Sequence, residues 1–342
     1  MKSIQELVQP HLLNLKPYSS ARHEFLGEAD IFLDANENPN ETGYNRYPDP
    51  LQTEVKRCIS HWRSVRTDQV FLGNGSDEAI DLMIRIFCRP GLDKIITTDP
   101  TYGMYKVSAQ TANVGIIRVP LTNTFQLSVK EIQAQFSDET KILFLCNPNN
   151  PTANLLDPAA MKTLIESFPG IVVIDEAYID FSLNDSWLPK LDHYDNLVIL
   201  QTFSKAWGLA GIRLGMAFAS PEIISWFNKV KPPYNVNILT QRVALKAFEN
   251  IGQQTTWVAE ILSERDRLAI ALNGIECIDT VYPSATNFIL VKMDDATRRY
   301  EQLTSQKIVV RNRSNVLLCE ECLRFTVGTP KENDKLINAL QS

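Results

Sequence analysis

The chain has 342 residues, of which 44% are hydrophobic and 22% are charged, and it carries a formal net charge of −6. This composition is typical of a globular protein that forms one large domain or two moderate ones. The acidic balance argues against a surface for nucleic acid or anionic membranes, and no apolar run is long enough to span a bilayer.

Residues 1 to about 30 predict an amphipathic helix followed by an exposed polar arm. The apolar positions of this helix are Ile4, Leu7, Val8, Leu12, Leu13 and Leu15. The segments 33–39 and 44–50 then cluster Asn, Pro and aromatic residues without the periodicity of a helix or strand. Such a connection more often makes contacts than contributes to a core.

From residue 51 to 219 the sequence alternates between helical and strand patterns. Helices are predicted at 51–62, 77–88 and 159–168, and strands at 70–72, 94–98, 115–119, 142–146, 171–174, 197–200 and 216–219. The alternation predicts an α/β fold with a mostly parallel sheet and right-handed crossovers. Ligands of such sheets bind outside the carboxyl ends of the strands, so the residues that follow each strand are the candidates for chemistry.

The last third of the chain predicts a smaller α+β unit. Helical patterns lie at 221–250 (broken near Pro232 and Pro233), 258–272 and 297–305, and strand patterns at 285–292, 308–310 and 323–327. We therefore expect three parts, which are an N-terminal arm with a small-domain segment at 1–45, a large ligand-binding domain at 46–240 and a small domain at 241–342.

The six cysteines are spread along the chain, apart from the pair Cys319 and Cys322. One C-x-x-C without a second pair does not complete a zinc site, so we predict reduced structural thiols and no metal. The N-terminus also lacks the apolar core of a signal peptide. Both features predict a cytoplasmic protein.

The run from Thr202 to Gly215 follows a predicted strand and combines hydroxyls, one lysine, glycines and one arginine. The hydroxyls of Thr202 and Ser204 and the guanidinium of Arg213 suit a phosphate dianion. Between them, Lys205 supplies an amine that condenses with an aldehyde when its site keeps it neutral. A reactive amine beside a phosphate cradle is what pyridoxal 5'-phosphate requires.

Two earlier strand ends carry groups that suit the same cofactor, and each also has a plainer explanation. Gly75, Ser76 and Asp77 begin a helix whose free N–H groups attract an anion, although Ser76 or Asp77 as a simple N-cap would explain the same residues. Tyr102 follows the next strand and either stacks on a flat ring or fills the core.

Two later strand ends add donors and a carboxylate. Asn150 lies in an Asn-Pro turn and either donates to a phenolate oxygen or only shapes the turn. Asp175 ends a buried strand, where a protonated pyridine nitrogen would balance its charge, unless it caps the next element. Tyr178 follows and suits the ring oxygen. Together with Lys205 these groups predict pyridoxal phosphate.

Several of these segments resemble the motifs of fold-type I pyridoxal-phosphate-dependent aminotransferases, and the resemblance covers essentially the whole chain. The matching residues are 150–152, 175–178, 204–205 and Arg213. Within that group, the segments 18–22, 34–39, 46–48 and 323–329 resemble the histidinol-phosphate aminotransferase family. The resemblance implies transamination of L-histidinol phosphate with 2-oxoglutarate, which gives imidazole-acetol phosphate and L-glutamate in histidine biosynthesis.

The resemblance also implies a role for each residue of the cofactor site. Lys205 would form the Schiff base with the cofactor, and Asp175 would contact the pyridine nitrogen. Tyr178 and Asn150 would contact the ring oxygen, and Tyr102 would pack on the ring. The residues implied around the phosphate are Gly75, Ser76, Asp77, Thr202, Ser204 and Arg213.

The substrate site and the partner subunit follow from the same resemblance. Arg324 would bind the substrate anion with help from Arg311 and Tyr18, and Asn36 is assigned to the same site. Tyr47 would reach the cofactor site of a neighbouring subunit, which implies a homodimer with shared active sites. Where the family usually has glycine after Asn-Pro-Thr, this chain has Ala153. A methyl group there adds strain if the turn needs a positive φ.

Three other functions stay open at the level of sequence. One is an aminotransferase for aromatic amino acids, and a second is a decarboxylase of the same fold that acts on a phosphorylated amino acid such as phosphothreonine. The third is a non-catalytic module that binds pyridoxal phosphate. A surface salt bridge would explain Arg311 or Arg324 without any substrate. A nucleotide-binding enzyme is disfavoured, because neither G-x-G-x-x-G nor a Walker A motif follows a strand.

Overall fold

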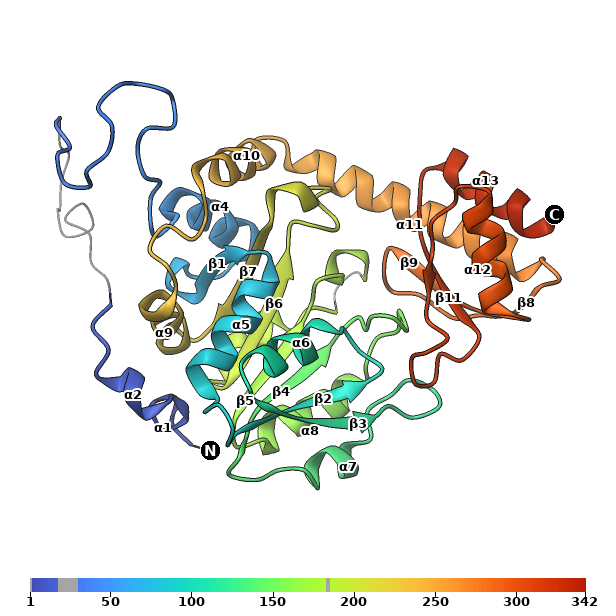
Figure 1. Ribbon diagram of the computed structural model, residues 1–342, viewed down its shortest axis with the longest axis horizontal. Coiled ribbons are helices and arrows are strands. Elements are labelled where there is room, and N and C mark those ends of the chain that lie inside the picture. Colours follow the sequence, from blue (N-terminus) through green and yellow to red (C-terminus); the bar gives the residue numbers. More distant parts are fainter. Residues whose placement is uncertain (1, 18–29, 183–184) are drawn as a thin grey trace.

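The computed structural model describes residues 2–17, 30–182 and 185–342 and contains a large and a small sheet (Figure 1). The strands of the large sheet are β1 (Val70–Asn74), β2 (Lys94–Asp99), β3 (Gly115–Pro120), β4 (Thr140–Cys146), β5 (Ile171–Asp175), β6 (Leu197–Thr202) and β7 (Leu214–Ala219). Their order is β1-β7-β6-β5-β4-β2-β3. Only β7 pairs antiparallel with its neighbours, so the predicted mostly parallel sheet is confirmed.

Helices cover both faces of the large sheet, which explains why its central strands are apolar along their whole length. On β4, Leu143 packs into the core beneath one set of helices, and the next residue, Phe144, packs into the core on the opposite face. The helices of this region are α4 (Thr53–Arg63), α5 (Ser76–Phe87), α6 (Met104–Thr111), α7 (Val129–Gln133), α8 (Pro158–Ser167), α9 (Pro221–Val230) and α10 (Ile238–Phe248).

The N-terminal segment forms two short helices, α1 (Ile4–Leu7) and α2 (Pro10–Leu13), so the prediction of one amphipathic helix is wrong. The break lies before Pro10, because the residue that precedes a proline is disfavoured in the helical region. Gln9 is accordingly extended and donates through its side chain to the carbonyl oxygens of Arg85 and Cys88. Ile4 and Leu7 of α1 and Leu12 of α2 are buried in the core that includes α5, whereas Leu13 is exposed.

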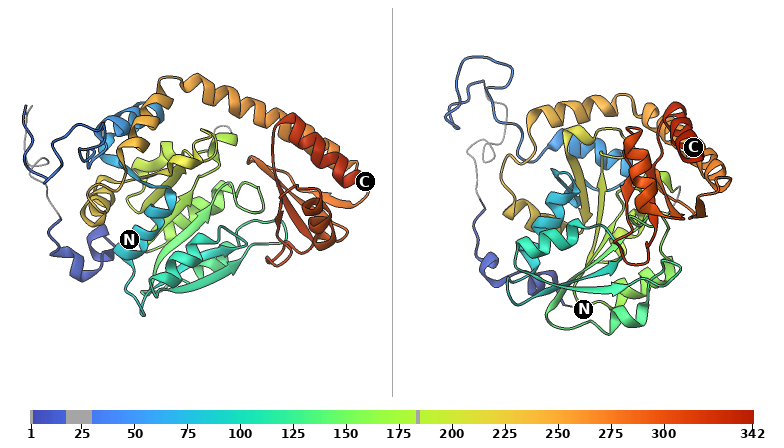
Figure 2. Two further views of the ribbon diagram at one scale, coloured as in Figure 1. Left: turned by 45° about the horizontal axis from the view of Figure 1, so that its top comes forward. Right: turned by 45° about the vertical axis from the view of Figure 1, so that its right-hand side comes forward.

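The small domain has its own core and an antiparallel sheet. Its elements are α11 (Ile251–Asn273), β8 (Ile278–Val281), β9 (Phe288–Met293), α12 (Ala296–Ser305), β10 (Arg311–Asn312), β11 (Cys322–Thr326) and α13 (Pro330–Gln341). The strand order is β10-β11-β9-β8. Both views of Figure 2 show α11 as a long helix that joins this domain to the helices of the large sheet.

The strand predicted at 308–310 is absent, and the edge strand begins at Arg311 instead. Ile308 and Val310 do pack against the core of the small domain, which explains their alternating pattern. However, the N–H of Ile308 donates to the carbonyl of Leu303 at the end of α12, at 2.9 Å, and is not available to a neighbouring strand.

Across the described residues, no helix is long and apolar enough to cross a membrane.

Candidate active site

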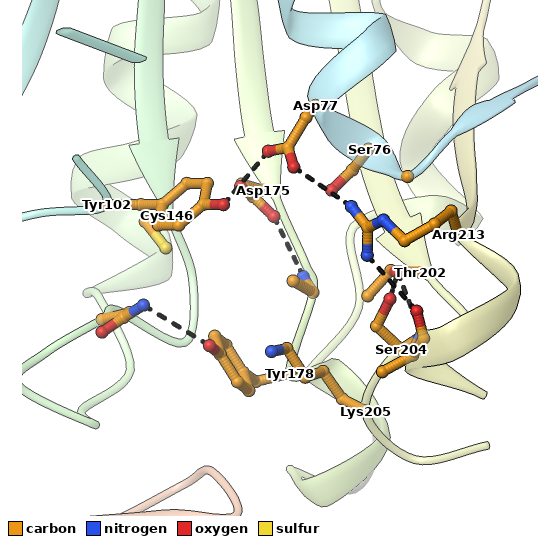
Figure 3. A pocket seen from close by; sticks show the side chains of 14 residues that line it. Ser76, Asp77, Tyr102, Cys146, Asp175, Tyr178, Thr202, Ser204, Lys205 and Arg213 are labelled. Atoms are coloured by element: carbon orange, nitrogen blue, oxygen red, sulfur yellow. Dashed lines mark hydrogen bonds and ion pairs between the residues drawn. The ribbon is translucent and has the colours of Figure 1, made fainter. Parts of the chain in front are cut away.

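A cavity lies at the carboxyl ends of the large-sheet strands, as expected for a parallel sheet (Figure 3). It brings together every residue predicted to hold the cofactor except Tyr47. The lining residues are Gly75, Ser76, Asp77, Tyr102, Cys146, Asn150, Asp175, Ala177, Tyr178, Thr202, Ser204, Lys205, Ala210 and Arg213. The loops after four neighbouring strands and the start of α5 therefore converge on one site.

One end of the cavity has the chemistry of a phosphate site. Gly75 caps α5 at φ +74° and contributes no side chain, so the first N–H groups of the helix face the cavity with the positive end of the dipole. A Cβ at Gly75 would lie 2.7 Å from Nη2 of Arg213, so glycine lets this guanidinium approach the helix. The hydroxyls of Thr202 and Ser204 lie 3.0 Å apart nearby. Among the described residues, the guanidinium of Arg213 donates hydrogen bonds only to Oδ2 of Asp77, at 3.4 Å, and to the carbonyl of Ala210, at 3.5 Å, so its other N–H donors remain available for an anion.

Asp175 lies at the floor of the cavity and is only 2% exposed. The hydroxyl of Tyr105 donates to its Oδ2 at 2.6 Å, and the N–H of Ala177 donates to its Oδ1 at 3.1 Å. Burial raises the pKa of Asp175 to about 6, and the hydrogen bond from Tyr105 opposes this rise. A buried carboxylate held by two donors is prepared for a cationic partner.

Tyr105 is a member of the site that the sequence analysis missed. It is fully buried, stacks on Phe144 with ring centroids 4.6 Å apart, and meets the ring of Tyr102 edge-on. Tyr102 lies in the loop that precedes α6, and Tyr105 lies in the first turn of that helix, three residues further along the chain. That spacing was the available signal, but an aromatic residue in a helix is usually only a core residue.

The amine of Lys205 points toward the ring of Tyr178, with Nζ 5.4 Å from the ring centre (Figure 3). Burial lowers the pKa of Lys205, and the nearby positive charge of Arg324 lowers it further. The amide of Asn150 donates to the hydroxyl of Tyr178 at 3.4 Å. Burial also raises the pKa of Tyr178, which keeps its phenol neutral. The site thus combines a lysine biased toward its neutral form with a neutral hydrogen-bonding phenol.

Arginines of the small domain approach the cavity from the other side. Nη1 of Arg324 donates to Oδ1 of Asn150, and its guanidinium lies 4.9 Å from the ring of Phe288. Arg311 is directly opposite Arg324 in the pairing of β10 with β11. The contact with Asn150 places Arg324 at the cavity wall. In the same wall, the hydroxyl of Tyr102 donates to Oδ1 of Asp77 at 3.1 Å.

Two other predicted site residues, Tyr47 and Asn36, do not line the cavity within one chain. Tyr47 is half exposed and stacks on Tyr234, with centroids 4.4 Å apart. Asn36 has φ +54° in the arm that precedes Tyr47. Tyr18 lies outside the described residues. Figure 2 shows the described part of this arm extending away from the two domains.

Ala153 adopts φ +65°, so the turn does need the positive φ that a family glycine would supply. The strain of a non-glycine residue in this region is about 1 kcal/mol. The Ala153 methyl is fully buried among Tyr178, Phe288 and their neighbours, and this packing offsets part of the strain.

The chain is similar to known proteins along almost its whole length. Residues 29–340 match the family described as aminotransferase class I and II. The chain is 53% identical over 342 residues to a histidinol-phosphate aminotransferase of Parabacteroides distasonis, with 100% of this chain and 99% of that protein covered.

Solved structures share the fold. The histidinol-phosphate aminotransferase of Clostridium acetobutylicum superimposes with a TM-score of 0.80 at 24% identity, covering 87% of this chain and 90% of that one. The Sinorhizobium meliloti histidinol-phosphate aminotransferase, solved in complex with pyridoxal 5'-phosphate, gives a TM-score of 0.78 at 22% identity over 86% of this chain and 82% of that one.

Proposed function

This chain belongs to the class I and II aminotransferases, and from that premise we propose that it transfers the amino group of L-histidinol phosphate to 2-oxoglutarate. The products are imidazole-acetol phosphate and L-glutamate, and the reaction is a step of histidine biosynthesis. One observation carries the proposal. A lysine biased toward its neutral form, a buried carboxylate and a phosphate cradle share one cavity, and an arginine of the small domain is hydrogen-bonded to its wall.

Pyridoxal 5'-phosphate is the cofactor, and the residues present fit it. The start of α5, the hydroxyls of Thr202 and Ser204, and Arg213 would hold its phosphate. Asp175 would hold the proton of the pyridine nitrogen, because this carboxylate is buried and already accepts two hydrogen bonds. The ring oxygen would be bound by Tyr178 and Asn150, and the ring face by Tyr102.

When bound, the cofactor supplies an aldehyde that takes up the amino group and a protonated ring that withdraws electrons from the substrate's Cα–H bond. Lys205 would then act as the general base that removes the Cα proton and as the general acid that delivers it to the aldehyde carbon of the cofactor. Its lowered pKa serves this role, because a neutral amine is the form that accepts a proton. Arg324 orients the substrate by binding its anionic group.

We propose a homodimer in which Tyr47 completes the partner's site. The support is that Tyr47 lies outside its own chain's cavity, on an arm that carries further exposed apolar residues, namely Leu33 at 91% and Tyr44 at 61%. A second copy of the chain would cover them. We also propose a cytoplasmic location, which fits six free cysteines.

The shared site predicts complementation between two inactive variants. Homodimers of Lys205→Ala and of Tyr47→Ala should both be impaired, and mixed dimers should recover activity because one of their two sites is intact. We would mix the purified variants, exchange subunits and measure glutamate formation. Each variant mixed with itself is the control. Mixed dimers with no recovered activity would mean that Tyr47 acts within its own chain.

The substrate assignment is tested by assaying the purified enzyme with L-histidinol phosphate and, separately, with L-phenylalanine, both with 2-oxoglutarate. We expect kcat/KM for L-histidinol phosphate to exceed that for phenylalanine at least about 100-fold, because binding the phosphate adds charge-assisted hydrogen bonds. Release of carbon dioxide from phosphothreonine without any keto acid would instead identify a decarboxylase. A higher kcat/KM for phenylalanine would identify an aromatic aminotransferase.

A further inference from the structure

The hairpin of β10 and β11 places three arginines on one face. Arg311 is paired with Arg324, and the N–H of Arg313 donates to the carbonyl of Cys322 at 2.8 Å, which continues the same register by two residues. Side chains two residues apart in a strand point to the same face, so Arg313 lies on the face of Arg311 and Arg324. The family resemblance implies roles for Arg311 and Arg324 but none for Arg313.

This arginine cluster has no anionic partner within residues 2–17, 30–182 and 185–342. The Nε atoms of Arg313 and Arg324 are buried and have no hydrogen-bond acceptor, although buried donors are normally satisfied. Burial, Arg324 and Arg311 together lower the pKa of Arg313 to about 10. Elsewhere in the small domain, Arg298 and Arg299 share the carboxylate of Asp294. The contrast indicates that the hairpin arginines are arranged for an anion that the described part of the chain does not supply.

The cluster is connected to the reaction site. Arg324 donates to Asn150, and Asn150 donates in turn to Tyr178 in the cavity wall. An anionic group held at Arg324 would therefore lie beside Arg313. A carboxylate has two oxygens and one negative charge, which a single guanidinium satisfies in a bidentate pair. A phosphate monoester has three terminal oxygens and up to two charges, and it needs further donors.

We propose that Arg313 is a specificity-determining residue that binds the phosphate of the amino donor together with Arg324 and contributes little to binding the dicarboxylate. The inference rests on the proposed function, because it takes L-histidinol phosphate as the donor. Arg324 serves both half-reactions, whereas Arg313 distinguishes between them. Replacing Arg324 should therefore weaken the binding of both substrates, whereas replacing Arg313 should weaken the binding of the phosphorylated substrate selectively.

The test uses the change in cofactor absorbance during the half-reaction to measure the apparent dissociation constant of the holoenzyme for each amino donor. Arg313→Gln should raise the constant for L-histidinol phosphate at least about 10-fold, and those for L-histidinol and L-glutamate less than about 3-fold. L-Histidinol lacks only the phosphate, so the ratio of its constant to that of L-histidinol phosphate isolates the phosphate contribution. Arg298→Gln, an exposed arginine of the same domain, is the matched control and should leave all three constants unchanged.

A second variant, Arg313→Lys, and a second probe, inorganic phosphate, test the role of Arg313 independently of how well Arg313→Gln folds. Arg313→Lys retains the charge but loses the planar pair of donors, so its effect should be intermediate even if Arg313→Gln folds poorly. Inhibition by inorganic phosphate should weaken in both variants. Equal changes for all ligands, or no change, would overturn the role of Arg313. If wild-type enzyme does not react with L-histidinol phosphate, the proposed substrate fails, while phosphate inhibition still decides whether Arg313 binds this anion.

Discussion

Lys205→Ala is expected to lower kcat about 10⁴-fold or more while the fold remains intact, because the variant loses both the covalent attachment of the cofactor and the base that moves the Cα proton. The side chain is partly buried and makes no hydrogen bond to another described residue, so its removal disturbs little packing. The visible absorbance of the imine between the lysine and the cofactor should also disappear. Single-turnover kinetics, absorbance and circular dichroism measure the three effects separately.

Lys162→Ala is a suitable control for this variant, since Lys162 is an exposed lysine on α8 that pairs loosely with Glu166 at 3.8 Å. It should keep full activity and the full spectrum. An unchanged spectrum in Lys205→Ala would show that a different amine carries the cofactor.

Asp175→Asn is expected to lower kcat/KM about 10³-fold, because removing one partner of a buried charge pair is worth roughly 4 kcal/mol. Asparagine has nearly the same shape, so the loss would report on charge rather than on packing. The affinity for pyridoxal phosphate, measured by equilibrium dialysis, should fall as well. A variant that kept its kcat/KM would contradict the role of Asp175 at the ring nitrogen.

The same carboxylate predicts how cofactor affinity depends on pH. Burial raises the pKa of Asp175 to about 6, so the carboxylate is ionised above that pH and becomes protonated as the pH falls through it. The ion pair that we propose with the ring nitrogen would therefore form above about pH 6 and be lost below it. Below that pH, the dissociation constant of pyridoxal phosphate should rise by up to about tenfold for each pH unit. Asp175→Asn should show a flatter dependence. Tyr105→Phe should move the midpoint to higher pH, because the hydrogen bond from Tyr105 lowers the pKa of Asp175.

The cofactor site was accessible from the sequence because parallel sheets obey a simple rule. Lys205 and Asn150 follow apolar strands and Asp175 ends one, and the carboxyl ends of parallel strands meet at one edge. Glycines and hydroxyls next to them added the phosphate chemistry. Local sequence was therefore enough to bring these residues together before any contact was known.

Tyr105 and Arg313 could not be found in the same way, since their roles depend on tertiary contacts. Tyr105 reaches Asp175 across 70 residues of sequence, and its helical position resembles that of any core aromatic. The side of the sheet on which Arg313 lies depends on the register between β10 and β11. These two strands are joined by a loop without periodicity, so the register could not be predicted from the sequence. The false strand at 308–310 shows the opposite error, in which core packing imitates strand alternation.

We propose that the amine of Lys205 holds the cofactor beside Asp175, and chemical trapping tests this attachment directly. Borohydride reduction of the holoenzyme makes the attachment permanent, and digestion followed by mass spectrometry then identifies the modified peptide. We expect the mass of the reduced cofactor on Lys205, in the segment that follows β6. A cofactor mass on any other lysine, or no modified peptide from an enzyme that is active before reduction, would contradict the account.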